Sequence, residues 1–322
     1  MACNISGMER TTRTGPGAKH KWLAAGAFLV VVLLGSFVSW GVGPQYGWTV
    51  FTVIPVVASA VGGVVLHRLH PETRYGNVVA ASAIGMGACL AILLAFAFEG
   101  LLCIAMASPL LAVEIAIGAG IGNAIGAWWV NKDRLLSISI LLLVIPGSTL
   151  LESRYGVAPF EDVVTTRAVI QATPEEIWPH LSALELPPPK ELLFRLGVAH
   201  PLAIRTQGKH RECVLSTGSM PEQITVSHAP HRLAFRVLST PPTMKELNPF
   251  GEVRAPHLEG YYQCVSGEFK LTRRPDGSTL IEGTSRYRCR IAPAAYWRLW
   301  SRKIVQDIHF RVFDEVARRV GG

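Results

Sequence analysis

The first half of the chain consists of long apolar runs that almost no charge interrupts, and these runs limit what the chain can fold into. A helix that crosses a bilayer needs about 20 mostly apolar residues. The candidate segments are Trp22–Val42, Trp48–Leu66, Asn77–Phe98, Pro109–Val130 and Leu135–Leu151. The last of these is shorter than the others and contains Pro146. We therefore predict an N-terminal α-helical membrane domain of about five spans.

The apolar stretch Gly100–Ser108 comes directly before the fourth of these runs. Proline suits the first turn of a helix and disrupts a helix interior. Pro109 therefore predicts the start of the fourth helix. We expect Gly100–Ser108 to be a connector or a short re-entrant piece.

The basic residues of the short loops predict how the spans are oriented, because Lys and Arg concentrate on the cytoplasmic side. They occur in the tail 1–21, after the second run and after the fourth run, as Arg10, Arg13, Lys19, Lys21, Arg68, Arg74, Lys132 and Arg134. The loops around Gly43–Gly47 and Glu99–Ser108 carry no Lys or Arg. Five spans then place the tail in the cytoplasm and residues 152–322 outside it. Without the fifth span, residues 152–322 would lie in the cytoplasm.

One face of the fourth span combines a carboxylate with small residues. Glu114, Gly118, Gly122 and Gly126 are spaced four residues apart, so they share this face. Glycines at this spacing let a second helix approach closely, which predicts a helix-packing face and allows a homo-oligomer through it. A carboxylate in a span also suggests a proton or ion relay. Since only Glu99, near a span end, could extend such a relay, the sequence disfavours a transporter or channel.

Charges, prolines and turn dipeptides return at ordinary soluble-protein density after Leu151. We therefore predict a membrane domain over residues 22–151 and one soluble domain over 152–322, which is long enough to bury a full core. The net charge of +8 is spread along the chain, without a basic stripe that contains aromatic residues. We expect no nucleic-acid partner.

The soluble half carries strand and helix signals in an α+β order. The β-branched run Val163–Ala172 predicts a strand, and Thr173, Pro174 and Glu176 form the capping box of the next helix. A short helix and six more strands are predicted at Glu191–Leu196, Leu202–Gln207, His210–Thr217, Glu222–His228, Arg232–Leu238, Tyr261–Thr272 and Thr279–Ile291. The last helix, Pro293–Val320, has one apolar stripe. This order predicts a curved antiparallel sheet wrapped on a long C-terminal helix.

The opening VVTTRAVIQATPEEIW at residues 163–178, followed by this order of elements, resembles the SRPBCC superfamily of START-like or helix-grip domains. That superfamily includes polyketide cyclases/dehydrases and lipid-transport domains. The resemblance covers about residues 155–320. Gly218–Ile224, Gly267–Leu271 and Tyr296–Trp300 resemble a membrane-anchored bacterial branch. The resemblance implies an apolar-ligand cavity between the sheet and the last helix, and a place in a bacterial inner (plasma) membrane.

Two segments hold polar or aromatic side chains that suit such a cavity. The loop 241–260 is long for a connector, and long loops often bind ligands or form lids. The last helix contributes aromatic residues and a histidine close to its apolar stripe. The predicted ligand-binding residues are Glu246, Arg254, His257, Tyr296, Trp297, Trp300 and His309. Two alternatives stay open. The loop could be a solvated surface segment, and the helix residues could be ordinary core residues.

The sequence contains none of the catalytic motifs that we sought, which were G-x-S-x-G, H-E-x-x-H, a P-loop and a G-x-G-x-x-G before a helix. Its cysteines form no C-x-x-C pair and lie at no zinc-ligand spacing with histidines, so we expect neither a cofactor nor a metal. A protein that binds an apolar small molecule or lipid, with membrane lipids around it, is favoured. One alternative is a cyclase/dehydrase-type enzyme with His257 or His309 as acid/base and Glu246 or Arg254 orienting its substrate. The other is a non-enzymatic sensory or interaction module.

Overall fold

The structure is a computed structural model, and it describes residues 16–42, 46–128, 134–253 and 255–321. The chain divides into two compact units. Unit 1 comprises Met1–Val38, Val53–Cys89 and Ala112–Gly147. Unit 2 comprises Ser39–Thr52, Leu90–Leu111 and Ser148–Gly322. The domain boundary near residue 151 stays a prediction.

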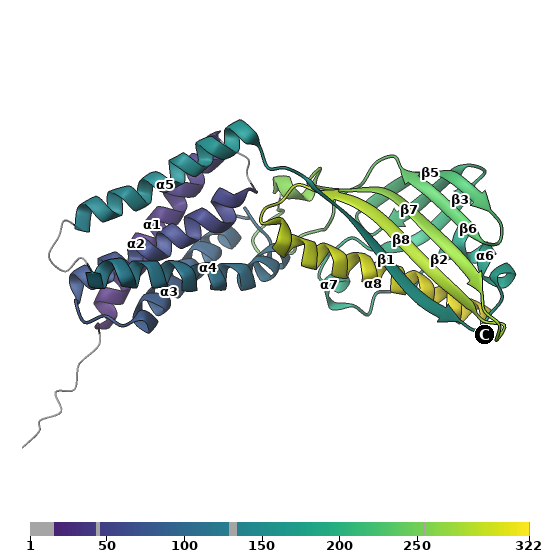
Figure 1. Cartoon of the computed structure of the whole chain (residues 1–322), viewed down its shortest axis with the longest axis horizontal. Coiled ribbons are helices and arrows are strands. Elements are labelled where there is room, and N and C mark those ends of the chain that lie inside the picture. Colours follow the sequence, from purple (N-terminus) through teal and green to yellow (C-terminus); the bar gives the residue numbers. More distant parts are fainter. Residues whose placement is uncertain (1–15, 43–45, 129–133, 254, 322) are drawn as a thin grey trace, which may run out of the picture. The chain divides into compact units, whose positions relative to one another are not determined.

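The first half of the chain forms long apolar helices (Figure 1). They are α1 (Ala18–Val42), α2 (Ile54–Leu69), α3 (Tyr75–Ala95), α4 (Leu101–Trp128) and α5 (Arg134–Tyr155), with a π-helical turn η1 (Thr49–Val53) before α2. Among the described residues, five helical stretches are long and apolar enough to cross a membrane. The prediction of five such helices is confirmed.

The expectation for Gly100–Ser108 is wrong, because α4 begins at Leu101 and continues through Pro109. A proline inside a helix leaves the carbonyl four residues earlier without its usual N–H donor. Here the Ser108 hydroxyl donates to that carbonyl, Ala105 O, at 2.9 Å. In apolar surroundings, Ser side chains commonly satisfy the backbone groups that a proline frees. The helix therefore starts more than two turns earlier than the proline suggested.

In unit 1, the glycine face of α4 packs against α2. A Cβ atom added to Gly118 would lie 2.3 Å from Val56 O, and one added to Gly122 would lie 2.4 Å from Ala60 O. A Cβ atom added to Gly126 would lie 2.5 Å from the His67 ring. Glu114 is buried on the same face. A homo-oligomer through this face would have to displace α2, and it stays a prediction.

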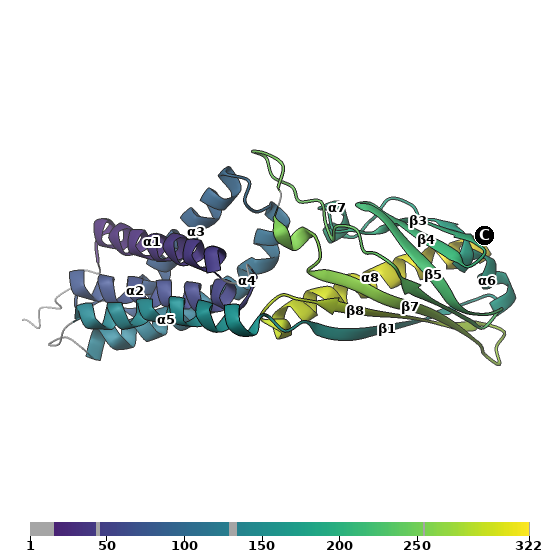
Figure 2. The same cartoon turned by 90° about the horizontal axis from the view of Figure 1, so that it is seen from above.

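Unit 2 is built on one antiparallel sheet in the order β1-β8-β7-β6-β5-β4-β3-β2. The strands are β1 (Phe160–Ile170), β2 (Leu184–Glu185), β3 (Pro201–Gln207), β4 (His210–Leu215), β5 (Gly218–His228), β6 (Arg232–Val237), β7 (Tyr262–Arg273) and β8 (Thr279–Cys289). Pairing shifts by one residue within β3, β5 and β7, and such bulges bend a sheet. Figure 2 shows the sheet curved around α8 (Ala294–Val320), with β1 and β8 on one side and β3 and β4 on the other. This confirms the predicted curved sheet on a long C-terminal helix, which is a helix-grip-like arrangement.

Unit 2 also contains three short helical segments, namely α6 (Pro174–Ser182), α7 (Leu192–Arg195) and the 3-10 turn η2 (Pro256–Leu258). The predicted capping box of α6 is confirmed. Thr173 N donates to the Glu176 carboxylate at 2.7 Å, and Glu176 N donates to Thr173 Oγ1 at 3.4 Å. These bonds satisfy backbone donors that the first helical turn leaves free.

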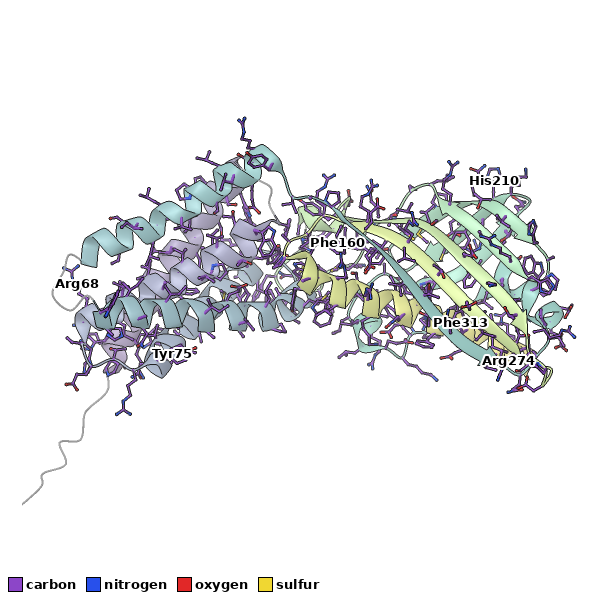
Figure 3. The ribbon with its side chains drawn as sticks, in the orientation of Figure 1. Arg68, Tyr75, Phe160, His210, Arg274 and Phe313 are labelled. Atoms are coloured by element: carbon purple, nitrogen blue, oxygen red, sulfur yellow. The ribbon has the colours of Figure 1, made fainter. Side chains whose placement is uncertain are left out.

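The core of unit 2 lies where the C-terminal part of α8 meets the sheet. Val312, Phe313 and Val316 of α8 are buried against sheet residues that include Leu271 and Ile281. Phe313, marked in Figure 3, lies against Gly283 of β8. A Cβ atom at residue 283 would come within 2.8 Å of the Phe313 ring. The glycine therefore allows the helix and the sheet to pack this closely.

Polar contacts attach the two short segments of unit 2, residues 39–52 and 90–111, which we call the connectors, to its long segment 148–322. The Glu152 carboxylate accepts from Trp48 N at 2.5 Å and from Thr49 N at 3.1 Å. The Asn248 side-chain amide donates to Leu94 O and to Glu99 O, each at 2.9 Å. The loop 241–260 is thus fixed to the segment between α3 and α4.

Candidate functional site

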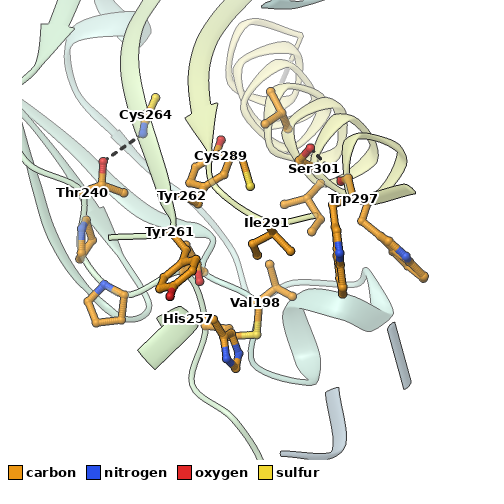
Figure 4. A pocket seen from close by; sticks show the side chains of 18 of the residues that line it. Val198, Thr240, His257, Tyr261, Tyr262, Cys264, Cys289, Ile291, Trp297 and Ser301 are labelled. Atoms are coloured by element: carbon orange, nitrogen blue, oxygen red, sulfur yellow. Dashed lines mark hydrogen bonds between the residues drawn. The ribbon is translucent and has the colours of Figure 1, made fainter. Parts of the chain in front are cut away.

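Unit 2 contains a partly open cavity of about 200 Å³ between the sheet, the first half of α8, the loop from Thr240 to Tyr261 and the connectors 39–52 and 90–111. On the same measure a single water needs roughly 10–15 Å³, so the space is large enough for an organic molecule. Figure 4 shows Trp297 and Ser301 of α8 on one side and Tyr261 and His257 on the other. Most of the lining surface is apolar. The cavity therefore suits an apolar ligand.

Four parts of the chain form the walls, and one of them is the loop from Thr240 to Tyr261 together with Val198 and Ala199. α8 contributes Trp297, Trp300, Ile304, Val305 and Ile308. The sheet contributes Cys213, Met220, Tyr262, Cys264 and Cys289. The connectors contribute Tyr46, Phe51, Cys103 and Met106. Residues 152–322 alone would therefore lack one wall of the cavity.

The aromatic residues at the start of α8 have different surroundings. Trp297 lines the cavity, its indole N–H donates to Ala292 O at 3.1 Å, and its ring contacts Phe51. Trp300 also lines the cavity. Tyr296 is not among the described lining residues, and its hydroxyl donates to Met106 O. Tyr296 thus attaches α8 to α4, while the two tryptophans remain available to a ligand.

Glu246 is placed where it caps a helix. Its carboxylate accepts from Leu102 N at 3.2 Å and from Cys103 N at 2.9 Å, at the first turn of α4. A helix start has free N–H groups and a partial positive charge, so a carboxylate there is stabilising. Burial raises the pKa of Glu246. Arg254, predicted beside it, lies outside the described residues.

His309 lies in the core, and it is not among the described residues that line the cavity. Its Nε2 is 2.9 Å from Ser285 Oγ, and its Nδ1 is 2.9 Å from Thr166 Oγ1. Only 4% of the residue is exposed, and burial lowers its pKa to about 4. A neutral imidazole with both nitrogens hydrogen-bonded is the arrangement of a structural histidine.

His257 lines the cavity and belongs to a polar cluster at one end of it. Its Nε2 is 3.0 Å from Cys103 Sγ, and its Nδ1 is 3.8 Å from Glu99 Oε2. The Tyr46 hydroxyl donates to Glu99 Oε1 at 2.8 Å. His257 shares none of these contacts with His309. The two histidines that the sequence offered as acid/base candidates therefore belong to separate sets of partners.

Burial sets the protonation of this cluster. It lowers the pKa of His257 to about 4, so the imidazole is neutral at pH 7. It also raises the pKa of Glu99 to about 7, opposed by the hydrogen bond from Tyr46 and assisted by the charge of Glu246. The pKa of Tyr46 is raised by burial and by Glu99. A neutral imidazole forms no ion pair, so His257 and Glu99 are not held together as a salt bridge at neutral pH.

The sequence did not predict Tyr46, Glu99 or Cys103 as cavity residues, and Glu99 was considered only as part of a proton or ion relay. The available signal was a carboxylate at the end of an apolar run and a cysteine four residues later. The expectation of no metal site rested only on the spacing of cysteines and histidines along the sequence. The structure brings Glu99, Cys103 and His257 together, with one ligand atom from each within 4.8 Å of the others. His257 is more than 150 residues away from Cys103, so spacing could not reveal this set.

Neither a family model nor a curated protein sequence matches the chain. Solved structures match about half of it. A conserved protein from Geobacillus kaustophilus is 14% identical, with 50% of this chain and 95% of that one covered and a TM-score of 0.33. Truncated norcoclaurine synthase from Thalictrum flavum is 14% identical, with 51% of this chain and 96% of that one covered and a TM-score of 0.31. The Aha1 dimer from Colwellia psychrerythraea is 12% identical, with 48% of this chain and 96% of that one covered and a TM-score of 0.28. The strand order and α8 define the fold.

Proposed function

We propose that this protein is a membrane-anchored binder of a hydrophobic small molecule or lipid. The observation that carries this proposal is the apolar cavity of about 200 Å³ between the curved sheet and α8. Ligand sites are typically concave and apolar with a few polar groups, and this cavity has that composition. The polar side chains Tyr46, Cys103 and His257 line it together. The expected ligand therefore has an apolar body and one polar group.

The composition of unit 2 supports an anchor of five crossings. Unit 2 contains the connectors 39–52 and 90–111 together with residues 148–322. Alternating crossings place both connectors on one side, and only a fifth crossing puts residues 152–322 on that side as well. Neither connector contains Lys or Arg. This absence favours the non-cytoplasmic side of a bacterial inner membrane for both connectors. Tethering raises the concentration of the cavity beside lipids.

The test is native mass spectrometry of the full chain, released from detergent, with organic extraction of what it retains. The full chain is required because the connectors form part of the wall. We expect one reproducible apolar species. Ile308→Trp should remove it by filling the cavity, whereas the control Leu299→Trp, at an exposed position of the same helix, should retain it. Equal occupancy in both variants would contradict the proposal.

A second candidate is the cyclase/dehydrase-type enzyme, because His257 presents an imidazole to the cavity beside the Cys103 thiol. A neutral histidine next to bound substrate can transfer a proton. His257→Gln distinguishes the two functions. A binder should retain the same species as the wild type, at equal or lower occupancy. An enzyme should retain an unconverted molecule of different mass.

A further inference from the structure

We propose that Glu99, Cys103 and His257 form a binding site for a divalent transition-metal ion, with Zn²⁺ as the expected occupant. The site lies at the polar end of the cavity, where Cys103 and His257 belong to the wall. One carboxylate oxygen, one thiol sulfur and one imidazole nitrogen lie within 4.8 Å of each other. This inference concerns the metal alone and holds whatever ligand the cavity binds.

The three donor types are those that zinc prefers in proteins. Zinc binds thiolate sulfur at about 2.3 Å, and imidazole nitrogen and carboxylate oxygen at about 2.0–2.2 Å, in a tetrahedron. These bond lengths place the ligand atoms roughly 3.3–3.8 Å apart. The contacts of His257 with Cys103, at 3.0 Å, and with Glu99, at 3.8 Å, use different nitrogens, Nε2 and Nδ1. A zinc ion would bind one of them, and with one nitrogen counted the three ligand atoms lie within 4.8 Å of one another. They would therefore have to approach by about 1 Å to reach tetrahedral separations.

An independent observation is that the cluster leaves two polar atoms without a partner. Glu99 Oε2 and His257 Nδ1 are buried, and among the described residues neither has a hydrogen-bond partner. Only 5% of His257 is exposed. Buried polar atoms without partners are rare in native proteins, and a bound ion is one way in which such atoms are satisfied. Both atoms are potential metal ligands in this cluster.

The surroundings favour a cation. Two carboxylates lie beside Cys103, since Glu246 accepts from Cys103 N at 2.9 Å and a Glu99 oxygen lies within 4.8 Å of the Cys103 sulfur. A bound metal ion displaces the thiol proton and compensates the negative charge of the thiolate and of a carboxylate ligand. This arrangement is therefore better suited to holding a metal than to serving as a cysteine nucleophile.

The neighbouring contacts hold the ligands in position. The Tyr46 hydroxyl donates to Glu99 Oε1, which leaves Oε2 for the metal. Glu246 accepts from Cys103 N and so fixes the first turn of α4. Hydrogen bonds of this kind orient ligands in known metal sites. Three protein ligands would leave a fourth position open, as in zinc sites that bind or activate small molecules. An oxygen of a cavity ligand or a water could occupy that position.

The first experiment uses the wild-type full chain, purified in detergent without chelator. Its metal content is measured by elemental mass spectrometry, and the chelated protein is then titrated with Co²⁺. We expect about one equivalent of zinc, and a thiolate-to-cobalt absorption band in the near ultraviolet that saturates at one equivalent. Absence of both zinc and the band overturns the proposal.

The second experiment tests the three ligands. Cys103→Ser should abolish the cobalt band, and Glu99→Gln and His257→Gln should each weaken Co²⁺ binding at least tenfold. The matched control is Cys264→Ser, which alters another cysteine of the cavity wall and should leave the band unchanged. A band that persists in Cys103→Ser assigns the thiolate elsewhere and overturns the proposal.

If these variants do not fold, an alkylation experiment on the wild-type protein still tests the proposal. Zn²⁺ should slow alkylation of Cys103 by a small maleimide more than tenfold, read from the mass of its peptide. Alkylation of Cys264 in the same sample should keep its rate. Equal effects of Zn²⁺ on both cysteines would overturn the proposal.

Discussion

The two halves of α8 carry one continuous apolar stripe, yet they do different things. In residues 309–320, which we call the core half, Val312, Phe313 and Val316 pack tightly against the sheet. In residues 294–308, the cavity half, Trp300 and Ile304 face open space. The stripe alone does not distinguish core from site. The difference arises from what the opposite wall supplies, since Gly283 brings the sheet close to the core half.

The two buried histidines show the same contrast on the scale of single side chains. Burial lowers the pKa of both to about 4. His309 has a hydroxyl partner for each nitrogen, whereas His257 has a thiol at one nitrogen and an unpartnered Nδ1 among the described residues. A shifted pKa therefore does not distinguish the two histidines, whereas the unpaired Nδ1 does. Most of the following experiments compare the core half of α8 with its cavity half, and one makes the same kind of comparison in unit 1.

The largest effect is expected from Phe313→Ala in the core half. Removing a fully buried phenylalanine loses its burial and leaves a void, which typically costs about 3–5 kcal/mol. The free energy of unfolding of the full chain, from chemical denaturation in detergent, measures this loss. The control Phe310→Ala, at a 44% exposed position on the same helix, should cost less than about 1 kcal/mol. Similar losses in both would show that the core half is not tightly packed.

The sequence predicted the elements of both units well, because hydrophobic period and capping residues act locally. Thr173 and Glu176 are an example, since three residues of separation fix their geometry. The start of α4 was missed because the Ser108 hydroxyl replaces the donor that Pro109 lacks. The wall of the cavity was missed for a different reason. Tyr46 and Cys103 reach it through contacts across more than 150 residues, which no local pattern encodes.

The second effect is a pH dependence of stability that originates in His309. Its folded pKa of about 4 lies below the ordinary value of 6.5, so the unfolded chain takes up a proton first as the pH falls. The contribution is therefore fully present above pH 6.5 and is lost as the pH falls toward 4. Between pH 7 and pH 5 this amounts to about 2 kcal/mol.

His309→Gln removes this titration while it keeps a polar group beside Thr166 and Ser285. His257 titrates in the same direction, so the informative quantity is the difference between variant and wild type. The wild type should lose about 2 kcal/mol more than the variant between pH 7 and pH 5. Equal losses would mean that water reaches His309 and that the core half is open.

In unit 1, α4 allows the same comparison on a single helix, because Gly122 lies on the face packed against α2 and Gly120 lies on a more open face. Gly122→Ala places a methyl group against the Ala60 backbone, and such overpacking typically costs about 1–3 kcal/mol. Gly120→Ala meets its nearest atom only at 4.0 Å, on the Tyr75 ring. Thermal unfolding in detergent should show a lower melting temperature for the first variant alone. If both variants melt like the wild type, α2 does not pack on this face.

The smallest change in stability is expected from Ile304→Phe in the cavity half. The cavity of about 200 Å³ has room for the larger ring, so the free energy of unfolding should change by less than about 1 kcal/mol. Val312→Phe enlarges a side chain of the same stripe two turns later, where the core is full, and should cost about 1–3 kcal/mol. Chemical denaturation of the two full-length variants measures the difference. Because the ring in Ile304→Phe takes up space inside the cavity, this variant should also lose the retained apolar species while it remains as stable as the wild type. A loss of stability equal to that of Val312→Phe would mean that the cavity half is packed like the core half, and the distinction between them would fail.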